Sequence, residues 1–190
     1  IGVIVVVGIG MVTYSNGVYN TAIKYQEEVD ESFADLQVDY QRRADLIPNL
    51  VATVKGYAAH EKETLEGVIK ARSQATAVNI DANNLTPEAI ANFQKAQSGL
   101  SGALSKLMVV VERYPDLKAN VNFLELQAQL EGTENRISKA RDDFNETTKT
   151  YNSYIRKFPK NLIASMFDFE AKGYFEAEEG TEKAPEVSFE

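Results

Sequence analysis

The sequence contains no cysteine and only one histidine, His60, and these two shortages exclude most metal and redox chemistry. Without cysteine the chain can form no disulfide, no thiolate metal site and no cysteine nucleophile. A zinc site on His60 would need two more good ligands, and the local sequence HEKE is not the HExxH pattern of metalloproteases. We interpret His60 as a solvated or capping residue, and we expect no metal and no cofactor.

Other patterns of catalytic residues are missing as well. The chain has no Glu-x-x-His pair of the kind that holds two iron ions in helical bundles, and it has no glycine-rich phosphate-binding loop. Paired carboxylates such as Glu27 and Glu28 are typical of a solvated helix face, because acid–base catalysis needs a cleft that shifts one pKa away from the other. We therefore expect that the protein is not an enzyme.

Basic residues are too few for a nucleic-acid partner. The chain has 20 lysines and arginines against 28 aspartates and glutamates, a net charge of -8. Binding to a phosphate backbone needs a clustered basic face, so we exclude nucleic acid. With 44% hydrophobic and 25% charged residues, the 190-residue chain can form one domain with a real core.

Charge is absent from the first twelve residues, IGVIVVVGIGMV, and we predict a transmembrane anchor over residues 1–17. A span needs about 20 apolar residues, and because the sequence begins without methionine we expect further residues upstream to complete it. The alternative is a cleaved signal peptide, but no small-x-small cleavage pattern precedes the polar stretch. Tyr14 and Tyr19 are suited to anchor the interface with the membrane.

The distribution of basic residues gives a weak indication of orientation. After the span, Lys24 is the only basic residue before Arg42. By the positive-inside rule this favours a single-pass protein whose long domain lies outside the cytoplasm.

Residues 18–158 are predicted to form a helical-bundle domain. Apolar residues of the first helix recur at alternating steps of four and three, with Arg43 in one slot of the series; they are Val29, Phe33, Leu36, Tyr40, Ile47, Leu50 and Val54. The series keeps its phase across Pro48, which predicts one helix that is kinked at Pro48. Because proline has no N–H, the Ala44 carbonyl is left without a hydrogen-bond donor. The alternative is a new helix that begins at Pro48.

Three more helices are expected, over residues 61–78, from a start at Thr86-Pro87-Glu88 to about residue 113, and over residues 119–157. The first helix after the anchor and the last one each cover about 40 residues, or about 60 Å. We predict an all-α protein in which a transmembrane helix is followed by an elongated antiparallel bundle with long first and last helices. An up-down-up-down order would return Phe158, the end of the last apolar series, to the membrane-facing end.

A cation in the apolar series needs a partner, because an isolated buried charge costs several kcal/mol. If the two long helices are antiparallel and of equal length, paired residue numbers sum to about 176, which places Arg43 opposite Thr133 and Glu134. We predict an ion pair between Arg43 and Glu134. The alternative is that the Arg43 side chain extends to water along its own stem.

Two segments follow the bundle. Residues 159–172 are predicted to be a short amphipathic segment, which either lies in the interface of an anionic bilayer or caps the core of the bundle. Its interface candidates are Lys160, Leu162, Ile163, Met166, Phe167 and Phe169. Residues 173–190 are predicted to be an acidic extended tail without a core of its own, whose aromatic residues Tyr174, Phe175 and Phe189 could dock on the bundle.

Several motifs resemble the LemA family: QRRADLIPNLV (residues 41–51), KGYAAHEKETLE (55–66), YPDLKAN (114–120) and LEGTENRISKAR (130–141), with FPKNLIASMF and YFEAEEG near the C-terminus. The resemblance covers nearly the whole chain, with the motifs in the right order. It implies a bacterial plasma-membrane protein with one span, a helical bundle and no established catalytic activity. Members often occur beside membrane zinc metalloproteases of the HtpX type, and a magnetosome member is known. The resemblance thus suggests envelope maintenance, with a membrane metalloprotease as partner.

Two functional hypotheses follow. The first is a non-enzymatic membrane-anchored scaffold or adaptor of the cell envelope, which self-assembles into a homo-oligomer or docks another membrane protein. The alternative is a lipid-surface-acting module that senses or shapes the bilayer. The apolar series do not require an oligomer, but the glycine spacing in the anchor permits close contact between helices.

Overall fold

Regular apolar spacing and well-placed helix caps produce helices along most of this chain. The computed structural model describes residues 2–176, and within that range it contains helices and their connections and no strand. The elements are α1 (Gly2–Tyr57), α2 (Lys62–Ala77), a 3₁₀ turn η1 (Ala82–Asn84), α3 (Pro87–Val111), α4 (Pro115–Lys118), α5 (Val121–Arg156) and α6 (Lys160–Met166). The predicted all-α class is confirmed.

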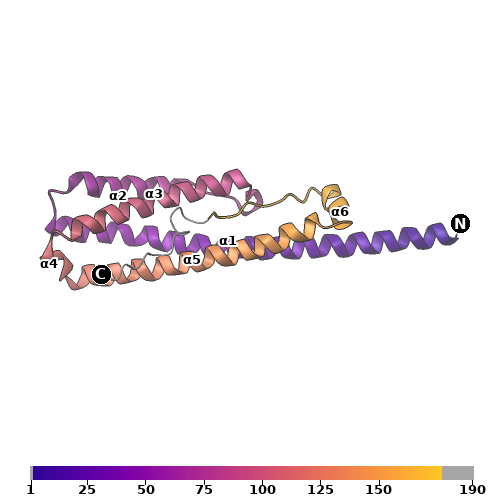
Figure 1. The fold of residues 1–190 in the computed structure, drawn as a ribbon, viewed down its shortest axis with the longest axis horizontal. Helices are drawn as coiled ribbons and strands as arrows, with labels where there is room; N and C mark the ends of the chain where they lie inside the picture. The colour runs from indigo at the N-terminus through magenta and orange to yellow at the C-terminus, as the bar shows by residue number, and fades with distance from the viewer. Residues whose placement is uncertain (1, 177–190) are drawn as a thin grey trace, which may run out of the picture.

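The two long helices run antiparallel along each other, and the hairpin of α2 and α3 packs on the half of α1 that is remote from the N-terminus (Figure 1). This confirms the elongated antiparallel bundle with long first and last helices. The end of α5 and the short α6 lie where α1 leaves the bundle. The order of the helices therefore returns the chain to the N-terminal end, as the sequence predicts.

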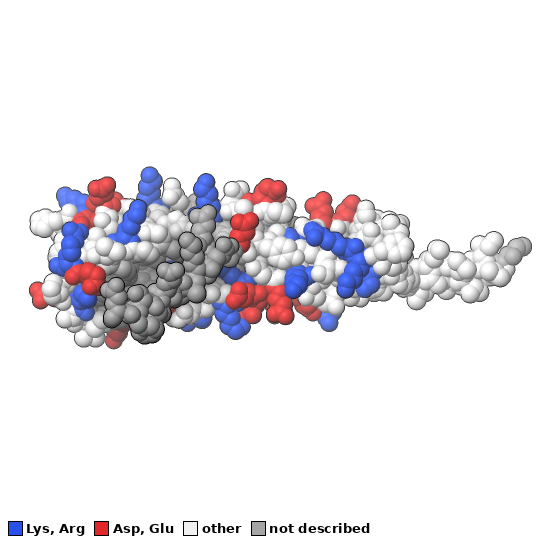
Figure 2. All heavy atoms as spheres, in the orientation of Figure 1, with Lys and Arg blue, Asp and Glu red and all other residues white. Residues whose placement is uncertain are grey.

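Helix α1 is one continuous helix of 56 residues that joins the apolar N-terminal segment to the bundle. Residues 3–12 are all exposed, and the first buried side chain is that of Val18. By length and composition, α1 could cross a membrane. In the space-filling view, the part of α1 that projects from the body carries no charged side chain, whereas both signs of charge are spread over the body (Figure 2).

The core consists of two apolar clusters arranged one after the other along the bundle. The cluster nearer the N-terminal end includes Phe33, Leu36, Tyr40 and Phe144, and the other includes Ile47, Leu50, Val54, Leu107 and Phe123. Every residue of the apolar series predicted for the first helix is buried. In the last helix the prediction is wrong at Phe158, which is 80% exposed, because α5 ends at Arg156 before Pro159 and the chain then turns away.

Pro48 lies inside α1, so the alternative in which a new helix begins there is wrong. A proline in a helix has no N–H to give the carbonyl one turn earlier, here that of Ala44. The structure supplies another donor: the Arg72 side chain of α2 donates from Nε to the Ala44 carbonyl oxygen at 2.7 Å. The helix thus continues through its proline with the orphaned carbonyl satisfied by a neighbouring helix.

The starts of α3 and α5 show side-chain caps. The Thr86 hydroxyl accepts a hydrogen bond from the Ala89 N–H at 3.2 Å, in agreement with the predicted helix start, and Asn120 caps α5 by accepting from the Phe123 N–H at 3.1 Å. Between them the sequence predicts only that one helix ends at about residue 113 and the next begins at residue 119. The structure adds the single-turn helix α4 from Pro115, which buries Leu117.

After α6 the chain turns at Phe167 and Asp168, where Asp168 has a φ of 55°, and then continues without helix or strand; we call residues 168–176 the strap. The strap runs back over the bundle, and its Phe175 is buried in the first apolar cluster. Phe167 and Phe169 lie beyond the end of α6, so the amphipathic segment is only partly helical. Phe189 lies outside the described residues.

If Arg72 satisfies the carbonyl that Pro48 orphans, the two residues must be energetically coupled. We expect Arg72→Met to lower the free energy of unfolding by about 1–3 kcal/mol, because it leaves a carbonyl without a partner. In a Pro48→Ala background the new N–H can bond Ala44, so the same change should cost less by about 1 kcal/mol. Chemical denaturation of the unchanged chain, the two single variants and the double variant measures the coupling. If the effects of the two changes on the free energy of unfolding are additive, this account is contradicted.

Candidate functional site

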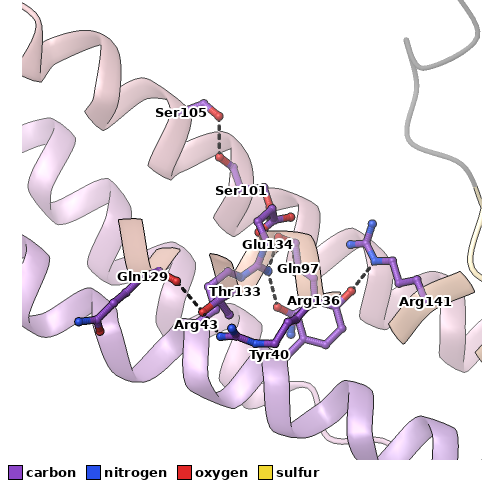
Figure 3. Close-up of polar contacts among 10 residues, drawn as sticks. All are labelled: Tyr40, Arg43, Gln97, Ser101, Ser105, Gln129, Thr133, Glu134, Arg136 and Arg141. Carbon is purple, nitrogen blue, oxygen red and sulfur yellow. Dashed lines mark hydrogen bonds and ion pairs between the residues drawn. The ribbon is translucent and has the colours of Figure 1, made fainter. Parts of the chain in front are cut away.

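The most elaborate polar site in the bundle is built around Arg43, whose side chain is only 1% exposed (Figure 3). Its Nη1 donates to Glu134 Oε2 at 2.9 Å and to Ser101 Oγ at 2.8 Å. Its Nη2 donates to Gln97, to Oε1 at 2.8 Å and to the backbone oxygen at 3.3 Å. The structure therefore brings together Arg43 and Glu134, and the alternative in which Arg43 reaches water is wrong.

A ring of further polar contacts surrounds Arg43 (Figure 3). The guanidinium carbon of Arg43 lies 5.2 Å from the centre of the Tyr40 ring, and the Tyr40 hydroxyl accepts a hydrogen bond from Arg141 Nε at 2.7 Å. Burial raises the pKa of the Tyr40 hydroxyl, although Arg141 opposes this effect. Arg136 donates from Nη2 to the Thr133 hydroxyl at 2.8 Å. The cluster joins α1, α3 and α5 through hydrogen bonds between side chains of all three.

A cavity of about 340 Å³ opens between α3 and α5 beside this cluster, lined among others by Arg43, Ser101, Glu131 and Glu134. Arg43 and Glu134 are paired with each other, and within residues 2–176 no group of three or more acidic or histidine side chains could hold a metal ion. His60 is exposed in the joint between α1 and α2. The arrangement around Arg43 is suited to holding the helices together.

The residues predicted for a membrane interface gather at the N-terminal end of the bundle but fall into two groups. Ile163 is buried, and Phe169 is partly buried, with its ring 5.6 Å from that of Tyr19. Leu162 and Met166 are 57% and 77% exposed. The inner residues thus cap the core while the outer residues face away from it, so one short segment presents both faces that the sequence left as alternatives.

Other predicted interface residues lie beside these. The Tyr19 and Phe167 rings are 4.9 Å apart and both are partly exposed, and Lys160 places its Nζ 3.9 Å from the centre of the Tyr154 ring. Tyr14 is 45% exposed, one turn of α1 beyond the end of the bundle.

Sequence reasoning missed Phe158 as a surface residue, although the proline after it is a signal that the helix must end. It is the most exposed aromatic side chain within the described range. We define the apolar collar as the exposed residues at the base of the projecting part of α1: Tyr14, Phe158, Leu162, Met166 and Phe167.

Basic side chains accompany the apolar collar. Arg156 and Lys157 are exposed at the end of α5, and Lys160 follows at the start of α6. In the space-filling view, a group of lysine and arginine side chains lies on the body close to the base of the projecting helix (Figure 2). An apolar surface beside cations is the pattern of a contact with an anionic bilayer.

Comparison with known proteins gives a consistent family. The model of the LemA family matches residues 32–189. The chain is 27% identical over 179 residues to Magnetosome protein MamQ 1 and to Magnetosome protein MamQ 2 of Paramagnetospirillum magneticum, a match that covers 83% of this chain and 64% of each relative. It is 28% identical over 160 residues to Protein LemA of Metamycoplasma hominis, covering 84% and 69%. The chain thus spans a little under two thirds of the magnetosome relatives.

The Arg43 site predicts an asymmetry between its two ion partners. Glu134→Ala leaves a fully buried cation without its counterion and should lower the free energy of unfolding by about 3–5 kcal/mol. Arg43→Met should cost less, because methionine fills the space and the remaining carboxylate, whose side chain is 47% exposed, is reached by water. The double variant should therefore be more stable than Glu134→Ala alone. Urea denaturation of the three variants checks this order of stability. A double variant with a lower free energy of unfolding than either single variant would refute it.

Tyr151 predicts how stability depends on alkaline pH. Its hydroxyl donates to the Glu170 carbonyl oxygen of the strap at 3.0 Å. Burial, with smaller effects from Asp30 and Glu170, raises the pKa of Tyr151 from 10.0 to about 12. Between these pH values the unfolded chain loses this proton and the folded chain keeps it, so stability falls as pH rises, whereas below pH 10 the group contributes no pH dependence.

Tyr151→Phe should consequently flatten the decline in the free energy of unfolding between pH 10 and 12 relative to the unchanged chain. It should also cost about 1 kcal/mol at pH 8 through the lost hydrogen bond. Denaturation at a series of pH values measures both effects. Parallel curves for the two chains above pH 10 would show that Tyr151 does not keep its proton in the folded state.

Proposed function

The chain belongs to the LemA family, and from that premise we propose that it is a non-enzymatic scaffold, anchored by a single span in the bacterial plasma membrane, whose helical bundle stands on the bilayer surface. The observation that carries this proposal is the position of the apolar collar. It lies where α6 packs against α1, at the base of the exposed apolar part of α1, and the projecting helix carries no charged side chain whereas the body is charged (Figure 2).

The dimensions support this placement. Residues 2–17 are helical and lie beyond the first buried residue of the bundle, and their length of about 24 Å is most of the thickness of a hydrocarbon core, about 30 Å. Tyr14 and Tyr19 then fall at the level where aromatic side chains commonly meet the headgroups. The charged body would lie wholly on one side of the membrane.

The continuity of α1 supports a scaffold rather than a flexibly tethered domain. The residues proposed to cross the membrane and the residues that form the core of the bundle belong to one helix, without a linker between them. A bundle held in this way has a fixed direction relative to the bilayer, which suits a protein that positions itself or a partner at the membrane surface.

The orientation and the partner are further parts of the proposal. The scarcity of basic residues directly after the anchor favours a bundle outside the cytoplasm. The family suggests a membrane metalloprotease as partner, and a second copy of the chain is the other candidate. The names of two relatives place those proteins in the magnetosome.

A lipid-surface-acting module is the second candidate, favoured by the basic residues beside the apolar collar. The two functions predict different co-purification results after the membranes are solubilised in detergent. A scaffold should bring down a constant protein partner or a second copy of itself from solubilised membranes. A module that acts on lipid should bring down neither, and should instead change the curvature or leakage of vesicles.

The absence of tryptophan allows a direct test of the apolar collar. In the full chain reconstituted in vesicles that contain anionic lipid, a tryptophan placed by Met166→Trp should be quenched by brominated lipid, because this position is expected to lie at the acyl boundary. Val109→Trp is the matched control: its site is 71% exposed, close to the 77% of Met166, but lies at the far end of the bundle and should not be quenched. Equal quenching at both sites, or none at Met166→Trp, would refute the placement.

A further inference from the structure

The strap is held by amide side chains in a way that resembles the recognition of a peptide. Asn152 accepts from the Lys172 N–H at 2.9 Å and donates to the Lys172 carbonyl at 2.8 Å. Asn145 accepts from the Phe175 N–H and donates to the Phe175 carbonyl, both at 2.9 Å. One side-chain amide therefore forms hydrogen bonds with both the N–H and the carbonyl of one strap residue, and this happens twice along α5. We call such an amide a clamp.

A third amide repeats the arrangement from the other wall of the groove. Gln94 of α3 accepts from the Glu176 N–H at 3.0 Å and donates to the Glu176 carbonyl at 2.8 Å. Such contacts bind the backbone of the strap and do not depend on the side chain of the residue that is bound. Groups on α3 and α5 thus replace the hydrogen-bond ladder that a neighbouring strand would provide.

The spacing of the clamps matches an extended chain. Asn145 and Asn152 are seven residues apart in a helix, which is about 10.5 Å. Their partners Phe175 and Lys172 are three residues apart in an extended segment, which is about 10 Å. The strap runs antiparallel to α5, and the two repeats stay in step over this length.

Side-chain pockets add selectivity to the backbone clamps. The buried Phe175 ring lies 5.4 Å from that of Phe144 and 6.2 Å from that of Phe93. Lys172 Nζ lies 2.6 Å from Asp30 Oδ1. Gly173 is the one position where a side chain is excluded, because a Cβ there would lie 2.7 Å from Pro87 Cα. The Tyr174 hydroxyl also accepts a hydrogen bond from Asn152 Nδ2 at 3.1 Å, so the groove fits the sequence Lys-Gly-Tyr-Phe.

We propose that this groove is a peptide-binding site that also accepts the strap of a second copy of the chain, so that exchange of straps links copies into an assembly. An emptied groove would expose the core around Phe93 and Phe144, so it must be refilled by a segment with the same features. A second copy carries that segment. This step rests on the proposed function: two copies anchored in one bilayer hold the strap of one copy and the groove of the other at the same height above it.

The connection between strap and bundle is suited to exchange. Residues 157–167 join α5 to the strap, and most of their side chains are exposed, with Ile163 and Ala164 the buried ones. The exposed side chains of the linker lose no contact when the strap leaves its groove, and exchange of an identical element between copies replaces each contact that buried residues lose with the same contact.

Complementation between two full-length variants tests the proposal. A strap variant, Gly173→Val with Phe175→Ala, keeps its groove but cannot fill it. A groove variant, Asn145→Leu with Asn152→Leu, keeps its strap but has lost the two α5 clamps. With two different affinity tags and in detergent, the mixture should give at least about ten times more co-recovery than either variant alone, because only the mixture pairs an intact strap with an intact groove.

Two controls define the result. Val109→Ala shortens an exposed side chain at the far end of the bundle, outside the strap, its linker and the apolar collar, and, in place of the strap variant, should not promote co-recovery with the groove variant. A chain with all four substitutions should not associate with either parent beyond background. Co-recovery that is the same for the mixture, the single variants and the fourfold variant would overturn the exchange of straps.

A second measurement does not depend on assembly. A synthetic peptide of residues 167–176 should raise the melting temperature of the strap variant, and the same peptide with the Phe175→Ala change should bind at least about tenfold more weakly. No stabilisation by the first peptide would overturn the peptide-binding site. Quenching of the Met166→Trp chain by brominated lipid is independent of these results, so failure here would leave the bilayer placement standing, and the converse also holds.

Discussion

The buried guanidinium of Arg43 is the contact on which the bundle depends. It is the one charged residue in the buried class within residues 2–176, and it lies between the two apolar clusters of the core. Its hydrogen bonds end on α3 and α5, so the hairpin and the last helix are fixed to α1 at one level. Apolar contacts alone would tolerate a shift of one helix along another, whereas a fork of directed hydrogen bonds does not. We infer that Arg43 sets the register of the bundle.

A fixed register has consequences at both ends of α1. Toward the distal half, Pro48 would weaken the helix next to the Arg43 site, and the Arg72 contact restores the lost interaction from α2. Toward the N-terminus, the same helix continues without interruption into its exposed apolar part. The register set at Arg43 therefore also determines which residues of α5 and α6 lie at the base of the anchor, and it is this placement that assembles the apolar collar.

The sequence predicts the parts of this structure that depend on periodic spacing. The apolar series of the first helix, the Thr86 cap and the pairing of Arg43 with Glu134 all follow from helix geometry and helix length, and each is present. The donor to the Ala44 carbonyl and the hydrogen bonds of Asn145 and Asn152 to the strap could not be found in this way. They depend on how α2 and the strap return to residues remote in sequence, and polar residues such as asparagine carry no periodic signal that marks a buried contact.

The strap and the apolar collar are linked because α6 joins them. The α2–α3 hairpin stops short of the end of the bundle where α1 leaves it, and α6 covers that end (Figure 1). Because α1 is continuous from the apolar N-terminal part into the core, every copy anchored in one bilayer would hold its groove and the start of its strap at the same height. A strap that leaves its own groove would therefore meet the groove of a neighbouring copy at the level of its own, whether or not the outer face of α6 rests on lipid.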